Sequence, residues 1–273
     1  MSSPSTKHLE PKTSPGPKQT TRLSMTGPVG ETETAPRKRV ILSMGGKGGV
    51  GKTNVMTGLA EWYQENQIPV TLLDLDTENK ARGSLTHFFG GQVPKINIHT
   101  AEGLDAFLDY LDSGPPIILA DMGGGAGRVT HTWFDEMYAP VARRGIVLTA
   151  VGVITADPAS VESVLAWADR LQRRVDYLIV ENQADEHANF TYWRESAQAR
   201  AFQETFQPAV MQMAYRLPHL ETAMRNHGVT LTEVVQRRTP VPELQLSKAV
   251  IRAEGYRERM FEQFETVKEL LLP

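Results

Sequence analysis

The chain has 273 residues, 40% of them hydrophobic, and a formal net charge of −3 at pH 7. This length suits one α/β domain with a sizeable core, and the near-neutral charge confines any basic surface to local patches. The absence of cysteine excludes disulfides, thiolate zinc sites, iron–sulfur clusters and cysteine nucleophiles. With neither a membrane-length apolar run nor a signal peptide, the expected location is the cytoplasm.

Residues 1–36 are rich in Ser, Thr, Pro, Gly and Lys, with few apolar side chains. Such a segment cannot bury enough surface to offset its ordering entropy, so the sequence predicts a disordered tail. The tail is mildly basic, which suits either a solubilising leader or an arm that contacts nucleic acid or a partner. Residues 37–273 are expected to form one domain that includes the C-terminal helices.

From Arg39 onward, short apolar runs alternate with stretches of helical periodicity. The predicted strands are 40–44, 70–74, 96–99, 116–121, 146–154, 177–180 and 210–215. The predicted helices are 52–66, 104–111, 129–143, 161–171, 191–206 and 245–271. This alternation predicts an α/β fold: a single doubly wound, mostly parallel sheet with helices on both faces. Ligands of such sheets bind beyond the carboxyl ends of the strands.

Residues 46–53 match the P-loop pattern G-x-x-x-x-G-K-[ST], between a predicted strand and a predicted helix. Glycines let backbone N–H groups approach phosphates, and the helix adds its positive N-terminal end. Lys52 would reach the outer phosphates, and the Thr53 hydroxyl would bind magnesium. The predicted nucleotide-binding residues here are Gly46, Lys47, Gly48, Gly49, Val50, Gly51, Lys52, Thr53 and Asn54. The expected cofactors are ATP and Mg²⁺.

Lys47 lies inside the loop, directly after Gly46, where an ordinary P-loop needs no lysine. With it, residues 47–53 resemble the deviant Walker A motif of the ParA/MinD family, and the resemblance extends over about residues 39–235. The resemblance implies a homodimer that sandwiches two ATP molecules, in which Lys47 crosses to the partner's nucleotide. There it would supply positive charge to the transferring phosphoryl group. The alternative is that Lys47 points to solvent.

Aspartates end two of the predicted strands, where they can face the phosphates. Asp76 aligns with the second aspartate of the family's D-x-D motif. The resemblance implies that Asp76 positions the attacking water and takes part in metal binding, whereas Asp74 supports the loop. The predicted catalytic residues are thus Lys47, Lys52 and Asp76. The family often continues with Pro-Gln, whereas this chain departs from that pattern with Thr77-Glu78.

Asp121 ends the apolar strand 117–120 in a Walker B arrangement, so Thr53, Asp76 and Asp121 are the predicted metal ligands. Residues 121–124 also fit the D-x-x-G switch pattern, in which a glycine such as Gly124 offers its backbone N–H to the γ-phosphate. Asn182 and Pro218 resemble family residues near the adenine base. An asparagine amide suits adenine because it both donates and accepts a hydrogen bond.

The family resemblance also implies partners. Basic pairs at Arg143-Arg144, Arg173-Arg174 and Arg237-Arg238 suit non-specific DNA binding by the ATP dimer, although each pair alone also suits a solvated helix end. A partner protein that stimulates hydrolysis is expected. The apolar stripe of the C-terminal helix has acidic neighbours, which suit an anionic membrane poorly. We therefore expect the stripe to pack against the domain, without stable membrane association.

The leading hypothesis is a slow ParA-like ATPase that partitions or positions DNA or another cargo. One alternative is a MinD-like ATPase that is recruited to membranes. Another is a metabolic ATP-dependent amidoligase or synthetase on the same fold, against which Lys47 argues. An electron-delivering iron protein is excluded because its cluster needs cysteines.

Overall fold

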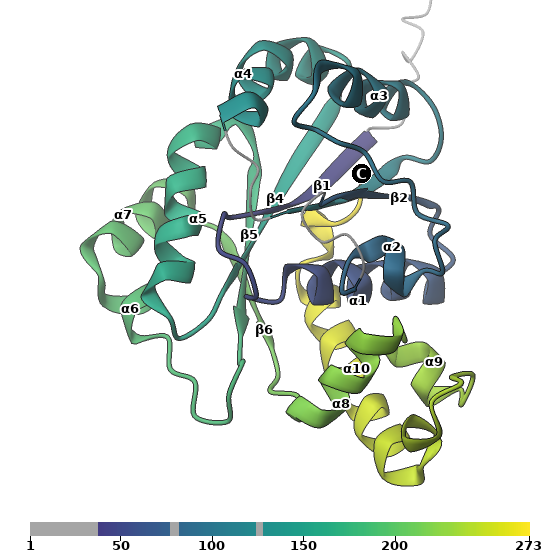
Figure 1. The fold of residues 1–273 in the computed structure, drawn as a ribbon. Coiled ribbons are helices and arrows are strands. Elements are labelled where there is room, and N and C mark those ends of the chain that lie inside the picture. The colour runs from purple at the N-terminus through teal and green to yellow at the C-terminus, as the bar shows by residue number, and fades with distance from the viewer. Residues whose placement is uncertain (1–37, 77–81, 124–127) are drawn as a thin grey trace, which may run out of the picture. The chain divides into compact units, whose positions relative to one another are not determined.

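The computed structural model describes residues 38–76, 82–123 and 128–273, so the predicted tail at 1–36 lies outside the described residues. In this part of the chain six strands form one sheet in the order β2-β3-β1-β4-β5-β6, with every pairing parallel (Figure 1). The strands are β1 (Lys38–Met44), β2 (Val70–Leu75), β3 (Ile117–Met122), β4 (Ile146–Ile154), β5 (Asp176–Asn182) and β6 (Ala209–Met213). The predicted parallel α/β fold is confirmed.

Helices cover both faces of the sheet, as Figure 1 shows. One face carries α3 (Ala101–Asp112), α4 (Arg128–Arg143), α5 (Pro158–Leu171), α6 (Thr191–Glu195) and α7 (Ala197–Phe206). The other carries α1 (Lys52–Glu65), α2 (Leu85–Phe88), α8 (Pro218–His227), α9 (Leu231–Val235) and α10 (Ser247–Thr266). Three 3₁₀ turns complete the described elements: η1 (Gln172–Arg174), η2 (Pro242–Gln245) and η3 (Lys268–Leu270).

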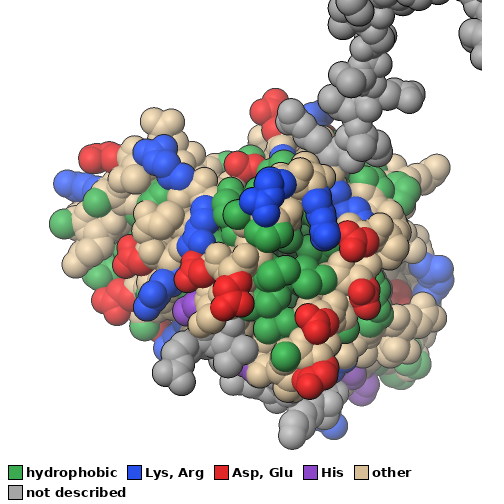
Figure 2. Space-filling view, turned by 90° about the horizontal axis from the view of Figure 1, so that it is seen from above, with side chains coloured by type: hydrophobic (Ala, Val, Ile, Leu, Met, Phe, Trp, Pro, Cys, Tyr) green, Lys and Arg blue, Asp and Glu red, His purple; other side chains and the backbone are tan. Residues whose placement is uncertain are grey.

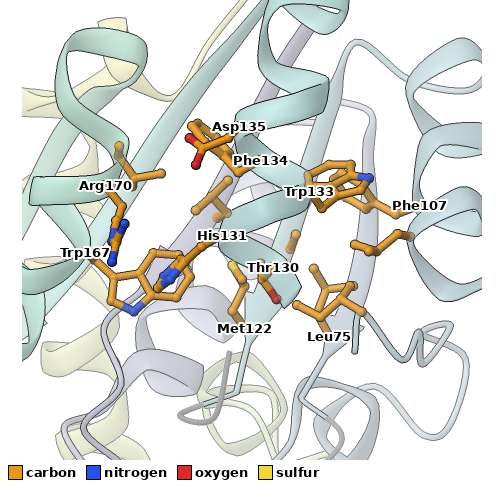
Figure 3. Close-up of a pocket in the computed structure, with 15 residues that line it drawn as sticks. Leu75, Phe107, Met122, Thr130, His131, Trp133, Phe134, Asp135, Trp167 and Arg170 are labelled. Carbon is orange, nitrogen blue, oxygen red and sulfur yellow. The ribbon is translucent and has the colours of Figure 1, made fainter. Parts of the chain in front are cut away.

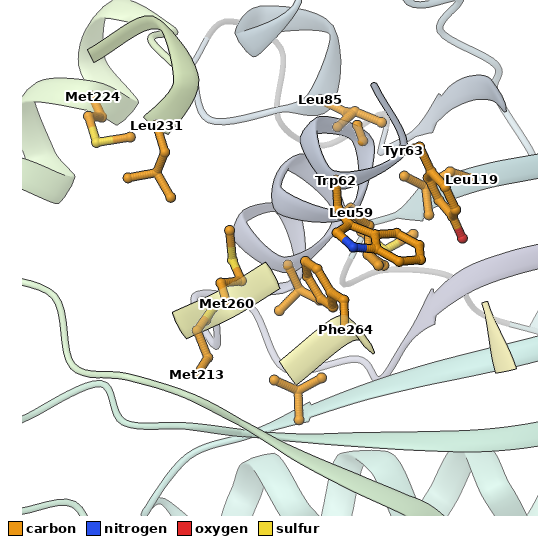
Figure 4. Close-up of a cluster of buried hydrophobic side chains, with 14 of the residues drawn as sticks. Leu59, Trp62, Tyr63, Leu85, Leu119, Met213, Met224, Leu231, Met260 and Phe264 are labelled. Carbon is orange, nitrogen blue, oxygen red and sulfur yellow. The ribbon is translucent and has the colours of Figure 1, made fainter. Parts of the chain in front are cut away.

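Successive side chains of a strand point to opposite sides, and the central strands β1, β3, β4 and β5 are buried on both faces. Val40 packs with α3 to α7, whereas its neighbour Ile41 packs with α1 and α10. This burial explains why the strands are continuous apolar runs in the sequence. Figure 4 shows the core between the sheet and the helices α1 and α10. There the rings of Trp62 on α1 and Phe264 on α10 lie 6.1 Å apart.

The strand order places the candidate site. From β1 the chain first moves toward one edge of the sheet, to β2. From β3 it crosses β1 to β4 and continues toward the other edge. The direction in which strands are added therefore reverses at β1. Parallel sheets bind ligands in the crevice at such a reversal, outside the carboxyl ends of the strands. The loop after β1 and the acidic ends of β2 and β3 meet there.

The prediction of a strand at 96–99 is wrong. Lys95 alone forms a bridge with β2, at Asp74, and the backbone N–H of Ile96 donates to the Asp74 carbonyl at 2.9 Å. Ile96 and Ile98 are nevertheless buried in the core under α3. The apolar alternation that suggested a strand therefore reflects burial of a loop.

The helix predicted at 191–206 is broken at Ser196, which has extended backbone angles (φ −64°, ψ 143°). Its hydroxyl accepts a hydrogen bond from the Ala199 N–H at 3.3 Å and so caps α7. Serine favours such a cap because its side chain replaces a missing backbone partner. The segment is two helices, α6 and α7.

The apolar stripe near the C-terminus packs into the core beside α1, as expected from its acidic neighbours. Phe264 and Leu271 are fully buried, and Val267 is nearly so. Among the residues that the structure describes, no helix is both long enough and apolar enough to cross a membrane.

Candidate functional site

The predicted phosphate-binding loop connects β1 to α1, and its glycines have backbone angles that other residues avoid. Gly49 and Gly51 have φ of 75° and 101°. A Cβ atom at Gly51 would also lie 2.6 Å from Asn182 Nδ2. Because Gly51 has no side chain with which to cap α1, the first N–H groups of that helix stay open to an anion.

Lys52 begins α1 and is buried, with 8% of its surface exposed. Its ammonium group donates to the Lys47 carbonyl at 2.9 Å, so the amine lies against the loop instead of extending into solvent. An ammonium group held within a loop of backbone N–H groups is suited to bind phosphate oxygens.

Lys47 is held by the first turns of α5. Its backbone N–H donates to Ser163 Oγ at 2.9 Å, and its ammonium group pairs with Asp157 Oδ2 at 3.3 Å. A hydrogen bond from the Ala159 N–H and the contact with Lys47 together lower the pKa of Asp157. The Lys47 side chain is 44% exposed, so it is neither buried in the site nor free of contacts.

The strand-end acids lie side by side because β2 and β3 pair with Asp74 in register with Asp121. Asp74 is fully buried and accepts the backbone N–H groups of Asp76 and Thr86, both at 3.0 Å. Lys95 lies 3.9 Å away. Asp74 thus ties together the backbone that follows β2.

Asp76 lines the cavity next to the loop. It is buried, and a Cβ atom at Gly123 would lie 2.5 Å from its Oδ1. The carboxylate therefore packs directly on the backbone that follows β3, and the glycine makes this approach possible.

Asp121 carries an oxygen with spare acceptor capacity. One oxygen accepts the Ser43 hydroxyl at 2.9 Å, whereas Oδ2 is buried without a hydrogen bond of normal geometry among the described residues. Burial raises the pKa of Asp121 to about 6; the hydroxyls of Thr53 and Ser43 oppose the rise, and the charges of Asp74 and Asp76 add to it. A hydroxyl beside an unsatisfied carboxylate is a donor set that fits Mg²⁺.

Within residues 38–76, 82–123 and 128–273, no group of three or more His, Asp or Glu side chains could hold a metal alone. Mg²⁺ keeps several water ligands and takes one or two carboxylates together with phosphate oxygens, so its sites need no such cluster. Thr53, Asp76 and Asp121, the predicted metal ligands, lie close together at this end of the sheet.

The cavity beside the loop has a volume of about 470 Å³. From the loop and α1 it is lined by Gly46, Gly48, Gly49, Gly51, Lys52, Thr53 and Asn54. Its remaining lining is Asp76, Arg82, Gly83, Met122, Glu221 and Arg225. Sequence reasoning missed Arg82, Glu221 and Arg225. Glu221 and Arg225 are four residues apart on α8 and so share a helix face, but no local motif marks that face as part of a site.

The residues predicted near the base differ in their placement. Asn182 donates from Nδ2 to the Val50 carbonyl at 2.8 Å, which places it under the loop. Pro218 is exposed at the first position of α8 and does not line the cavity. Gly124 lies outside the described residues.

A second cavity, of about 40 Å³, lies between the sheet and α3, α4 and α5 (Figure 3). Its walls are mostly aromatic and aliphatic, and they include Met122, which follows Asp121. The polar atoms Thr130 Oγ1, His131 Nε2 and Trp133 Nε1 are buried there without hydrogen-bond partners among the described residues. Space of this size holds a water molecule or two, so the cavity is not a nucleotide site.

The three basic pairs follow different elements: Arg143-Arg144 ends α4, Arg173-Arg174 lies in η1, and Arg237-Arg238 follows α9. Arg144 pairs with Asp112 at 3.2 Å, and Arg174 pairs with Asp135 at 2.7 Å. Two of these arginines thus have carboxylate partners. Because α4 and α9 cover opposite faces of the sheet, the pairs do not form one continuous patch.

The side of the molecule that bears α3 and α4 exposes hydrophobic side chains, with basic and acidic side chains around them (Figure 2). A groove of about 420 Å³ runs between these helices and includes Leu108, Trp133 and Met137. Asp105 and Glu136 line the same groove. A surface of this composition is poorly suited to the DNA phosphate backbone, which attracts uniformly basic surfaces.

Comparison with known proteins places these features in one family. Residues 41–253 match the model of the CobQ/CobB/MinD/ParA nucleotide binding domain. No curated protein matches the chain in sequence. The MinD cell division protein of Aquifex aeolicus has a similar structure, with a TM-score of 0.53 and 14% identity over 86% of this chain and 98% of that chain.

A putative plasmid partition protein from Borrelia burgdorferi, bound to AMPPNP, has a TM-score of 0.48 and 13% identity over 85% of this chain and 99% of that chain. At such low identity, the likeness to MinD shows a shared fold. The family match, which covers most of the chain, shows more: the chain belongs to the CobQ/CobB/MinD/ParA nucleotide-binding domain family.

Proposed function

We propose that the chain binds ATP with Mg²⁺ at residues 46–54 and hydrolyses it slowly, and that ATP-bound chains pair to partition or position DNA or another cargo. The observation that carries this proposal is the cavity of about 470 Å³ in which the loop glycines, Lys52 and Thr53 meet Asp76 at the carboxyl edge of the sheet. Its lining supplies backbone N–H groups, an ammonium group, a hydroxyl and a carboxylate, which are the groups that phosphoryl transfer requires.

Each residue has a distinct part in the proposed reaction. Lys52 would leave the Lys47 carbonyl and neutralise the outer phosphates. Thr53 and Asp121 would hold Mg²⁺, which when bound supplies positive charge to the phosphate oxygens. Asp76 would orient the attacking water, since its carboxylate lines the cavity and is fixed against Gly123.

Lys47 supports the dimeric part of the proposal. Its side chain is half exposed and pairs with Asp157, which is also half exposed. Exposed ion pairs are weak because water screens both charges. Lys47 can therefore exchange Asp157 for a phosphate of a second subunit without a large loss of stability.

The alternatives share the site and differ in what surrounds it. A MinD-like function requires a surface that binds membranes, but the apolar stripe of the C-terminal helix is packed in the core. An amidoligase or synthetase would need a small carboxylic acid for turnover. Phosphate release that depends on such an acid would favour that reading over ours.

The test uses the purified full chain. Calorimetry with MgATP should show binding, light scattering should show a dimer with ATP, and phosphate release should be slow. Lys52→Ala should abolish productive binding, and Asp76→Ala should trap the ATP dimer. Lys47→Ala should bind ATP but neither dimerise nor hydrolyse it.

Lys248→Ala, which changes an exposed lysine on α10, is the matched control and should behave as the wild type. Absence of ATP binding by the wild type would overturn the proposal, and intact dimerisation of Lys47→Ala would overturn its dimeric part. A DNA shift assay with and without ATP then tests the cargo: a shift that requires ATP supports DNA, and its absence points to another cargo.

A further inference from the structure

We propose that Arg225, together with Arg82, binds the phosphates of the nucleotide from a second wall of the cavity. This inference rests on the proposed function, because it assigns two further residues to the same ligand. Arg225 lies on α8, and Arg82 follows β2, so both are remote in sequence from the loop at 46–53.

The balance of charges around the cavity supports the assignment of a second wall of cations. Among the described residues that line it, the cations are Lys52, Arg82 and Arg225, and the carboxylates are Asp76 and Glu221. Without the arginines, one lysine would face two carboxylates, which is an unfavourable setting for a polyanion. With them, the cations outnumber the carboxylates.

Neither guanidinium group forms an ion pair with a carboxylate of residues 38–76, 82–123 or 128–273. The nearby carboxylate, Glu221, already has partners: Asn54 Nδ2 donates to its Oε1 at 2.9 Å, and Arg216 lies 4.0 Å from its Oε2. Arg82 and Arg225 therefore line the cavity without an ion pair to any carboxylate in the described part of the chain.

The stem of Arg225 is positioned by Gly83. A Cβ atom at Gly83 would lie 3.4 Å and 3.5 Å from Cγ and Cδ of Arg225, so the Gly83 backbone lies directly beside the Arg225 stem. Gly83 also has a positive φ of 79°, which favours glycine at this point. The contact brings the segment after β2 against α8 and holds both arginines at the same side of the cavity.

Helix α8 is itself attached to the phosphate-binding loop. Asn54 follows Thr53 in the first turn of α1, and its hydrogen bond to Glu221 connects that turn to α8. Arg225 is one helical turn beyond Glu221. The distance between the loop and Arg225 is thus set by a direct side-chain contact, which reduces the entropy cost of closing on a ligand.

Arginine is suited to this role because its planar fork can bind two phosphate oxygens at once. Phosphates of DNA are another possible anion, but a cavity that contains the P-loop favours the nucleotide. The two sources predict different results: a nucleotide contact changes the affinity for ATP, whereas a DNA contact changes only the affinity for DNA.

The experiment measures ATP and ADP binding to the full chain by calorimetry with Mg²⁺. Arg225→Gln should weaken ATP binding about ten-fold, which is the change in affinity expected when one charge-assisted hydrogen bond is lost. Arg82→Gln should weaken it less, and Arg225→Lys should restore part of the affinity because it keeps the charge without the fork. Arg252→Gln, at an exposed arginine on α10, should leave it unchanged.

Thermal unfolding without nucleotide separates a lost contact from a damaged fold, since Arg225→Gln should leave the melting temperature unchanged. Wild-type ATP affinity in both Arg225→Gln and Arg82→Gln would overturn the inference while leaving the proposed function intact. An effect on DNA binding alone would also overturn it. If the wild type failed to bind ATP, both the inference and the proposed function would be wrong.

Discussion

Gly51 illustrates how one residue can be fixed by two independent constraints. Its φ of 101° is strained for any residue with a side chain, and a Cβ atom would meet Asn182 Nδ2 at 2.6 Å. Gly51→Ala should therefore lower the free energy of unfolding by about 2–3 kcal/mol, combining backbone strain with loss of the bond from Asn182 to the Val50 carbonyl. Urea unfolding measures this change.

Gly48→Ala is the matched control within the same loop. A Cβ atom there would meet nothing within 4 Å, so its effect on stability should stay within about 0.5 kcal/mol. Equal destabilisation by the two substitutions would mean that the contact between Gly51 and Asn182 does not constrain the loop.

Asp121 makes stability without ligands depend on pH. Its folded pKa of about 6 exceeds the ordinary 3.8, so the folded chain binds this proton more tightly than the unfolded chain. The resulting stability is fully present below about pH 4 and is lost as the pH rises through 6. Between pH 5 and pH 8 the loss should be about 1 kcal/mol.

The side chain of Asp121→Asn cannot titrate, so its free energy of unfolding should lack the pH dependence that Asp121 gives the wild type. Urea unfolding of the wild type and the variant without Mg²⁺ measures this difference. The same substitution should abolish Mg²⁺-dependent phosphate release. Asp109→Asn, at an exposed carboxylate on α3, should keep the wild-type pH dependence. Identical pH profiles for the wild type and Asp121→Asn would contradict the assignment.

The residues of the site differ in how visible they are in the sequence. Residues 46–54 form one contiguous motif whose spacing follows from the needs of a phosphate ligand, so they could be predicted together. Arg225 lies next to Gly83 at the cavity only when α8 packs beside the residues that precede α2. No periodicity or local motif reports a contact between segments so far apart.

Among the elements, α9 is short and depends on its cap. Thr230 Oγ1 accepts the Glu233 N–H at 3.3 Å, and Glu233 Oε2 accepts the Thr230 N–H at 2.9 Å. A helix of this length has little intrinsic stability, so the reciprocal cap is important. Thr230→Ala should lower the free energy of unfolding by about 1 kcal/mol, as measured by urea unfolding.

Thr222→Ala, at an exposed position within α8, provides the comparison for Thr230→Ala, since it removes a threonine hydroxyl away from any cap. Its effect should be within about 0.5 kcal/mol. If Thr230→Ala were equally mild, the packing of Leu231 and Val234 against α10 would be sufficient to hold α9 without the cap.

Element boundaries show where sequence reasoning ends. The buried strands were predictable because both of their faces are apolar, and α1 because it follows a recognisable loop. At 96–99 the apolar pattern is present without a strand, and at 191–206 the helical pattern is interrupted at a single residue, Ser196. Ser196 could serve either as a helix residue or as a cap, and tertiary packing decided between them.

At the scale of the whole molecule, residues 270–272 are bonded to the domain by side chains from three other elements. The carbonyls of Leu270, Leu271 and Leu272 accept hydrogen bonds from Thr149, Tyr63 and Arg39, at 2.8, 2.7 and 2.7 Å. These donors belong to β4, α1 and β1, so one short segment connects three elements at the end of the sheet that is opposite the candidate site. A membrane-binding tail would leave its side chains exposed, whereas here Leu271 is in the core and Leu270 and Leu272 pack against it.

Deletion of residues 267–273 should therefore destabilise the domain strongly. It removes two buried side chains, Val267 and Leu271, and leaves the Tyr63 hydroxyl without its acceptor. Each buried group left unsatisfied costs about 1–3 kcal/mol, so the total should be several kcal/mol and the temperature of thermal unfolding should fall clearly.

The full chain, in turn, should not sediment with anionic vesicles in the presence of ATP. A truncated protein that kept wild-type stability, beside a full chain that bound vesicles, would mean that the segment leaves the core for the membrane.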